Sequence, residues 1–365
     1  MLKEIDLVYR TMFAELGQRT LDANFKADFA ITGRFVTVTV KGNEYWYFDT
    51  PTDSGDKRTY VGPKSDAEIS KRVAAFKEIK DDLRARRKLV STLTRDAGMT
   101  SPERFTGDIV EVLADAGLFR LRSVLVGTVA FQTYSGVLGI KLPSAAMQTG
   151  DADFAQFHSI STAVGDTIPP VLDVLRQIDP SFRKVPHQSG NLTTQFENAK
   201  KYKVEFLTPN TGSDDFASKP ASMPALGGAA AEPLRFLDYL IHEPVRTVLL
   251  HKSGVSVNVP APERYAVHKL IVASRRRSDD NGISKRDKDA QQAALLCEAL
   301  ITTRRQSDLA IAYAEAWERG QAWQEGITRG WSFIAERQRA DLITGLAKGM
   351  GDIGLDPASY GLNIN

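Results

Sequence analysis

Two carboxylates on a short apolar stretch constrain this chain more than any other feature of its sequence. Residues 150–155 read Gly-Asp-Ala-Asp-Phe-Ala, so one small apolar residue separates Asp151 from Asp153. On a β-strand, residues two apart share a face, so we expect both aspartates on one face and Ala152 and Phe154 in a core. Two adjacent carboxylates repel each other, and one takes up a proton unless a cation binds them. The stretch therefore predicts a Mg²⁺ site, with a solvated turn as the alternative.

Two further segments predict partners for this strand. Residues 121–126 are strand-like, and Gly127 and Thr128 follow them directly before a segment that can form a helix. Backbone N–H groups and the dipole of a helix N-terminus attract phosphate oxygens. Residues 203–207 form another strand-like run, in which Glu205 is flanked by apolar residues. If that strand pairs beside the Asp-x-Asp strand, Glu205 completes a cluster of three carboxylates.

These blocks resemble the signature of the nucleotidyltransferase superfamily related to DNA polymerase beta. A Gly followed by a small residue, an acid-x-acid strand and a third acid correspond here to Gly127-Thr128, Asp151-x-Asp153 and Glu205. The resemblance implies that the three acids bind Mg²⁺, with Mn²⁺ as an alternative, and catalyse nucleotide transfer from an NTP. The spacing from Gly127 to Asp151 is longer than in most members, and Glu205 stands where Asp is usual. The longer spacing is expected to reshape the pocket.

A later block is similar to the abortive-infection type E toxin branch of that superfamily. Residues 262–269 read Pro-Glu-Arg-Tyr-Ala-Val-His-Lys, and three arginines follow at 275–277. Helical rise places His268 and Lys269 on neighbouring faces, so only one of them can face the site. Following the resemblance, we expect Lys269 to act in catalysis by contacting the NTP phosphates. His268 is expected to be a packed or surface residue.

The same block continues through residues 285–289, Lys-Arg-Asp-Lys-Asp, after an Asp-Asp-Asn-Gly loop. The resemblance implies that Arg286, Asp287 and Asp289 open a helix and help to bind the nucleotide. Ordinary helix capping by acids is the alternative interpretation. From about Tyr60 to Trp323 the chain resembles more closely an uncharacterised bacterial family with a nucleotidyltransferase fold. That resemblance gives a fold and a site without a substrate.

Composition limits the classes of function that fit. The formal net charge is +2, so any binding to nucleic acid must come from local patches. The single cysteine, Cys297, rules out an internal disulfide framework and is expected in a helix core. No apolar run approaches the roughly 20 residues of a membrane span, and the N-terminus lacks a signal-peptide core. We therefore expect a cytoplasmic protein without membrane contact; the oligomeric state stays open.

The N-terminal region predicts a β-hairpin followed by a long basic helix. Strands are expected at 35–40, 45–48 and 58–61, and the helix carries four clustered cations between Arg84 and Lys88. Exposed Arg34, Lys41, Tyr45 and Tyr47 would suit stacking on bases and binding of phosphates, so tRNA or another RNA is the expected acceptor. The alternative is a ribbon that covers a helix, with a solvated charged face.

The pattern as a whole predicts an α+β fold, in which flanking helices cover a mixed sheet. We expect an N-terminal hairpin and helix over residues 1–100, a nucleotidyltransferase core over 101–260 and a C-terminal helical bundle over 261–365. Residues 210–233 are expected to form a loop beside the site. The predicted function is Mg²⁺-dependent transfer to a hydroxyl acceptor, in a toxin or defence context. The alternatives are a non-catalytic nucleotide- or RNA-binding module and an antitoxin or partner-binding protein.

Overall fold

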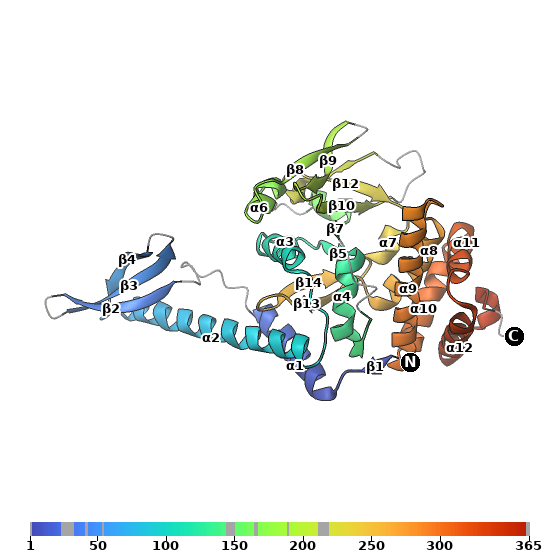
Figure 1. Cartoon of the computed structure of the whole chain (residues 1–365), viewed down its shortest axis with the longest axis horizontal. Coiled ribbons are helices and arrows are strands. Elements are labelled where there is room, and N and C mark those ends of the chain that lie inside the picture. Colours follow the sequence, from blue (N-terminus) through green and yellow to red (C-terminus); the bar gives the residue numbers. More distant parts are fainter. Residues whose placement is uncertain are drawn as a thin grey trace.

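A mixed β-sheet lies at the centre of the protein (Figure 1). The computed structural model describes residues 2–22, 33–40, 43–52, 55–143, 150–163, 167–187, 190–210 and 219–362. Seven of the described strands form this sheet: β5 (Val124–Val126), β7 (Asp151–Ala155), β8 (Arg183–His187), β9 (Gly190–Glu197), β10 (Lys203–Pro209), β11 (Ala221–Ser222) and β12 (Ala230–Leu234).

The strand order is β11-β12-β10-β7-β5, and β9 also lies against β10 with β8 beyond it. Strand β10 is parallel to β7 and β12, whereas the pairs β5–β7, β8–β9, β9–β10 and β11–β12 are antiparallel. One face of the central strands is buried, because Ala152, Phe154, Val204 and Phe206 all point into the core. The Phe154 and Phe206 rings stack with centroids 5.8 Å apart. The opposite face of β7 and β10 is thereby left for polar side chains.

Short helices and a hairpin cover the sheet. They are α3 (Arg104–Asp115), α4 (Gly127–Leu138), α5 (His158–Ala163), α6 (Val171–Arg176), η3 (Pro224–Leu226), α7 (Leu237–Leu240) and the hairpin β13 (Val245–Leu249) with β14 (Val255–Val259). The prediction of a loop over residues 210–233 is wrong in part, because β11, η3 and most of β12 lie within it. Residues 211–218 of that segment lie outside the described residues. The mixed sheet with its helices confirms the expected α+β class.

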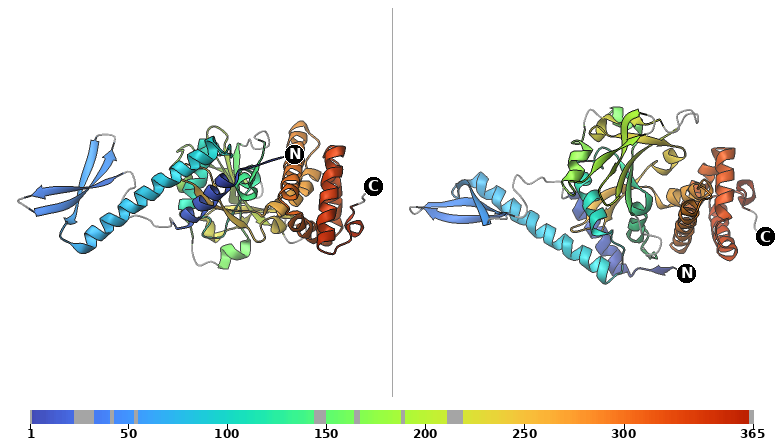
Figure 2. Two further views of the ribbon diagram at one scale, coloured as in Figure 1. Left: turned by 90° about the horizontal axis from the view of Figure 1, so that it is seen from below. Right: turned by 45° about the horizontal axis from the view of Figure 1, so that its top comes forward.

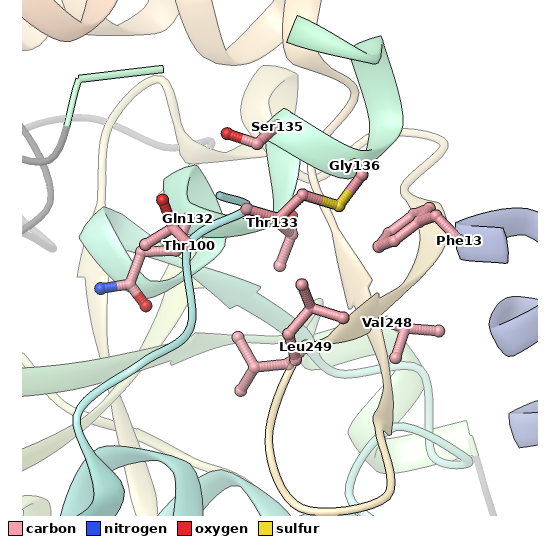
Figure 3. Close-up of a pocket in the computed structure, with 10 residues that line it drawn as sticks. Phe13, Thr100, Gln132, Thr133, Ser135, Gly136, Val248 and Leu249 are labelled. Atoms are coloured by element: carbon pink, nitrogen blue, oxygen red, sulfur yellow. The ribbon is translucent and has the colours of Figure 1, made fainter. Parts of the chain in front are cut away.

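The first residues of the chain pack on this central body. Strand β1 (Lys3–Glu4) pairs antiparallel with β6 (Ile140–Lys141), and α1 (Leu7–Asp22) lies against α4 and β13. Figure 3 shows Phe13 of α1 beside Gly136 and Val248 in that seam. A β-carbon at Gly136 would lie 2.3 Å from the Phe13 ring, so this close contact requires glycine. Residues 2–22 therefore belong to the body, although the sequence grouped them with the hairpin.

A three-stranded antiparallel sheet projects from the body at the far end of a long helix (Figures 1 and 2). Its strands are β2 (Arg34–Val40), β3 (Asn43–Thr52) and β4 (Gly55–Pro63), and the helix is α2 (Ala67–Arg95). Rings of Phe35, Phe48 and Phe76 meet edge to face and join the sheet to the helix. The Trp46 indole also donates a hydrogen bond to Ser70 Oγ. These elements confirm the predicted hairpin, third strand and long helix.

Helices make up the C-terminal region. They are α8 (Pro262–Ser274), α9 (Asp280–Thr302), α10 (Gln306–Glu318), α11 (Gln321–Trp331), α12 (Glu336–Asp352) and η4 (Pro357–Tyr360). Cys297 is buried in α9, as the sequence predicted, and burial raises the pKa of its thiol to about 12. Among the described helices, none is both long enough and apolar enough to cross a membrane.

Candidate active site

Three carboxylates lie together on the polar face of β7 and β10. The two strands are parallel, and their register places Glu205 opposite Asp153 and Lys203 opposite Asp151. Side chains two residues apart point the same way, so Asp151, Asp153 and Glu205 share one face. The predicted pairing of the Glu205 strand beside the Asp-x-Asp strand is therefore confirmed.

The cluster is electrostatically strained in the absence of a cation. Burial raises the pKa of Asp153 well above its usual range, and the charges of Asp151 and Glu205 raise it further. Burial and the Asp151 charge likewise raise the pKa of Glu205, although the Gln195 side-chain amide donates a hydrogen bond to its carboxylate. Carboxylates in this position must take up protons or bind a cation. Their oxygens are the hard donors that Mg²⁺ prefers, so the residues fit that ion.

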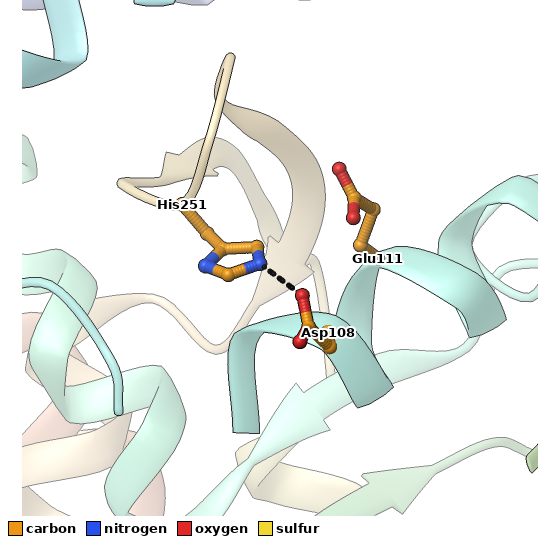
Figure 4. Close-up of side chains that lie close together, drawn as sticks. All are labelled: Asp108, Glu111 and His251. Carbon is orange, nitrogen blue, oxygen red and sulfur yellow. Dashed lines mark hydrogen bonds and ion pairs between the residues drawn. The ribbon is translucent and has the colours of Figure 1, made fainter. Parts of the chain in front are cut away.

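A second acidic group has the closer ligand spacing but already holds a cation. Ligand atoms of Asp108, Glu111 and His251 all lie within 4.8 Å of one another (Figure 4), whereas the three strand carboxylates do not form such a group. The ammonium of Lys252 lies 2.7 Å from Asp108 Oδ1 and 2.5 Å from Glu111 Oε2. His251 Nε2 lies 2.9 Å from Asp108 Oδ1. We therefore treat this group as an ion-pair network that ties α3 to the hairpin.

Gly127 brings the N-terminus of α4 against the carboxylates. Its φ is +66°, in the left-handed region that favours glycine, and a β-carbon there would lie 2.6 Å from Asp153 Oδ2. No side chain caps the first turn of α4, and the Tyr265 hydroxyl donates a hydrogen bond to the Gly127 carbonyl at 2.9 Å. Thr128 is buried in that turn. Free backbone N–H groups at a helix start can bind phosphate oxygens.

Lys269 is buried in α8 and is held by Asp289. Lys269 Nζ lies 2.5 Å from Asp289 Oδ1, and Arg276 Nε lies 2.7 Å from Asp289 Oδ2. Burial alone would raise the pKa of Asp289, but the two cations hold it below its usual value. Both cations also act on Asp153, whose pKa they lower. Asp289 thus fixes two positive groups within electrostatic reach of the carboxylates.

The His268 imidazole is neutral at pH 7. It is buried beside Lys269, and burial with the neighbouring positive charge lowers its pKa to about 3. The expectation that His268 is a packed residue agrees with this burial.

The expected position of Arg286, Asp287 and Asp289 at a helix start is wrong. Helix α9 begins at Asp280, and Asp279 caps it by accepting a hydrogen bond from the Gly282 N–H. The three residues therefore lie inside the helix. Asp289 contacts Lys269, but Arg286 pairs with the exposed Asp287, and its guanidinium lies over the Phe333 ring.

The site includes further cations near α8 and α9, and the sequence analysis did not assign them to it. Arg276 acts on Asp153, and Lys285 acts on Glu205, whose pKa it lowers. Burial, and the charge of Lys269, lower the pKa of Lys288, while Asp151 opposes that shift. Helical spacing was the available signal, because residues 285, 288 and 289 lie on one face of α9. Cations of α8 and α9 therefore lie within electrostatic reach of the three carboxylates.

Comparison with known proteins gives one result. A family model described as Nucleotidyltransferase matches residues 104–318, which is more than half of the chain. No curated protein and no solved structure matches the chain. The matched region begins with α3, includes all strands of the central sheet, and ends with α10.

Proposed function

The chain belongs to the nucleotidyltransferase family, and we propose that it transfers a nucleoside monophosphate from an NTP to a hydroxyl acceptor at the β7–β10 carboxylates. The observation that carries this proposal is the register that sets Glu205 opposite Asp153, beside the Gly127 turn. Acids that share one strand face, next to an uncapped helix N-terminus, suit a phosphoryl-transfer site. Asp151, Asp153 and Glu205 are the proposed metal-binding and catalytic residues.

We assign a role to each group from its charge and from the groups that it contacts. Mg²⁺, or Mn²⁺ in its place, held by the three carboxylates would neutralise charge on the reacting phosphate. The backbone of Gly127 and Thr128 would bind phosphate oxygens, and Lys269 and Arg276 would stabilise the departing pyrophosphate. Asp289 is proposed to position those two cations, because it contacts both of them. Arg286 and Asp287, which the sequence placed in the nucleotide site, have no role in this proposal.

In this reaction the acceptor oxygen forms a bond to the α-phosphorus of the NTP. The bond from that phosphorus to its bridging oxygen breaks, pyrophosphate leaves, and the hydroxyl proton is released to solvent. Such a displacement requires little covalent chemistry from the protein, so catalysis rests on positioning and on electrostatic stabilisation.

The experiment that tests this function uses NTPs labelled at the α-phosphate, Mg²⁺, and total RNA or cell lysate as a source of acceptors. Asp151→Asn and Asp153→Asn should each abolish transfer while the protein stays folded, with the exposed Asp173→Asn as the matched control. Full activity in either site variant would overturn the assignment. Mg²⁺–NTP binding without transfer to any acceptor would favour the alternative of a non-catalytic binding module.

An RNA acceptor and a role in toxicity or defence stay separate predictions. The basis for RNA was the projecting sheet together with the cluster of cations between Arg84 and Lys88 in α2. In the sheet, the described cations are paired. Arg34 and Arg58 both contact the buried carboxylate of Asp49, and Lys64 pairs with Glu44. Lys41 lies outside the described residues. A cation that is paired with a carboxylate attracts phosphates less strongly. The pairing therefore weakens the prediction that the projecting sheet binds RNA.

A further inference from the structure

A cavity of about 290 Å³ lies next to the carboxylate cluster, at a fork in the sheet. Strand β10 pairs with β9 over residues 203–205 and with β12 over residues 207–209, on the edge opposite β7. The two neighbours of β10 therefore separate just after Glu205, and the cavity occupies the gap between them. In Figure 1 these strands form the upper part of the body.

The wall of this fork cavity combines apolar side chains with two carboxylates. Glu205, Gln195 and Glu232 line it, and the strand register places all three on the polar face of the sheet. His187 Nε2 lies 3.1 Å from Glu232 Oε2, and both side chains are largely buried. Among the described residues that line the cavity there is no lysine or arginine. The cavity thus differs sharply in charge from the α8–α9 side of the site.

We propose that the fork cavity binds the acceptor, and that the acceptor is a small hydroxyl-bearing molecule with an amino group, such as an amino sugar. This inference rests on the proposed function. In-line displacement requires the attacking oxygen to approach opposite the leaving pyrophosphate. Lys269 and Arg276, the cations proposed for pyrophosphate, act electrostatically on Asp153 of β7, whereas the fork opens at Glu205 on the edge of β10 that faces away from β7 and β5.

Size and charge select the class of acceptor. Small-molecule sites generally span about 300–1,000 Å³, so a cavity just below that range takes a single ring-sized group. Glu232 would attract an ammonium and repel a phosphate, because opposite charges favour and like charges oppose binding in a partly buried site. Hydroxyl groups would find hydrogen-bond partners in Gln195 and His187. An RNA end, with its backbone phosphates, fits this wall poorly.

The test compares acceptors that differ in charge, three of which share one sugar scaffold. Transfer from labelled NTPs is measured to glucosamine, glucose, glucose 6-phosphate and an RNA oligonucleotide with a free 3′ end. We expect glucosamine to be modified fastest and glucose 6-phosphate slowest. Glu232→Gln should reduce the preference for glucosamine over glucose about fivefold, the size expected for one partly exposed ion pair.

A second variant tests the cavity independently of its charge. Val185 lines the fork, so Val185→Trp should fill it and lower transfer to every small acceptor. Mg²⁺–NTP binding, followed by calorimetry, should be unchanged in Val185→Trp and in Glu232→Gln. Asp173→Asn, an exposed change on α6, is the control that alters neither acceptor preference nor NTP binding.

Saturation-transfer NMR measures whether glucosamine binds to the protein when no NTP is present. A signal in the wild-type protein that Val185→Trp removes supports the proposal. If glucosamine gives neither signal nor product while another acceptor is labelled, the acceptor proposal fails and the proposed function stands. Transfer to the RNA oligonucleotide alone, or acceptor preferences that neither variant changes, would also overturn it. Loss of Mg²⁺–NTP binding in the wild type would instead refute the proposed function.

Discussion

Gly127 and Asp153 approach so closely that a β-carbon at position 127 would lie 2.6 Å from Asp153 Oδ2. The register explains the approach, because Val126 of β5 pairs with Asp153 of β7 immediately before the chain turns into α4. The left-handed φ of +66° at Gly127 makes that turn possible. One glycine therefore sets both the direction of α4 and the position of its first N–H groups beside a carboxylate.

Gly127→Ala should damage both stability and activity. The backbone alone should cost about 1–2 kcal/mol, because a left-handed φ is unfavourable for alanine, and the new methyl must displace the Asp153 carboxylate. Urea unfolding and the nucleotide-transfer rate measure the two effects. Gly150→Ala is the matched control, since it precedes Asp151 and meets no atom within 4 Å. Equal behaviour of the two variants would show that the Gly127 contact is unimportant.

Asp153→Asn should stabilise the metal-free protein at neutral pH, which is opposite to the effect of most substitutions. Burial, with the Asp151 and Glu205 charges, raises the folded-state pKa of Asp153 above its unfolded value. Stability from its protonation is therefore full below the unfolded pKa of about 4 and is lost as pH rises through the folded pKa. Asn removes the charge and should flatten this pH dependence.

Thermal unfolding of the wild type and Asp153→Asn across pH, each with and without Mg²⁺, checks this expectation. Mg²⁺ should stabilise the wild type and have little effect on the variant, because binding to the folded state alone raises stability. A lower midpoint for metal-free Asp153→Asn at neutral pH would contradict the strain argued for this cluster.

The strand face that carries the three carboxylates could be predicted from the sequence, but the rest of the site could not. Asp151, Asp153 and Glu205 could be placed on one face because strand periodicity is local and only one pairing had to be assumed. The fork could not be predicted, because β12 reads Ala-Ala-Glu-Pro-Leu, and a proline in a short segment without alternating apolar residues favours a loop. Its strand character comes from long-range pairing with β10. The sequence therefore gave no reason to assign Glu232 to the site.

The cation side was missed for a different reason. The Asp-Asp-Asn-Gly segment reads as a loop, yet Asp279 caps α9 and the helix starts at Asp280. Residues 285–289 therefore lie inside the helix, and the packing of α9 on α8 brings Lys288 and Asp289 near Lys269. The capping pattern, an Asp three residues before Gly282, was present in the sequence, but we interpreted the segment as a loop.

Asp289→Asn should cost about 3–5 kcal/mol of stability, because removing one partner of a buried ion pair leaves the other charges without compensation. Lys269 and Arg276 both contact Asp289, and the side chain of Asp289 is only 4% exposed. Asp287→Asn, two residues earlier and exposed, should change stability by less than about 0.5 kcal/mol. Chemical denaturation measures both. A similar loss in the two variants would refute the positioning role of Asp289.

Lys269→Ala should weaken Mg²⁺–NTP binding and slow transfer together. The ammonium is proposed to act on phosphate charge in both the bound substrate and the transition state, so affinity and rate should fall in parallel. Calorimetry with the NTP and single-turnover kinetics separate the two effects. His268→Gln is the neighbouring control, since His268 is neutral at pH 7. Unchanged affinity and rate in Lys269→Ala would make its pairing with Asp289 purely structural.

The projecting sheet should be dispensable for chemistry on a small acceptor. Arg19 of α1 lies 3.0 Å from Asp82 of α2, so a short Gly-Ser linker can replace residues 23–78 and still join the two helices. Residues 2–22 remain because Phe13 packs against Gly136. The shortened protein should keep Mg²⁺–NTP affinity and transfer to glucosamine within about twofold, since distant sites generally act independently. If transfer to every acceptor instead collapses while Mg²⁺–NTP binding persists, the projecting sheet presents the acceptor. Steep salt dependence of binding would then indicate a polyanion such as RNA.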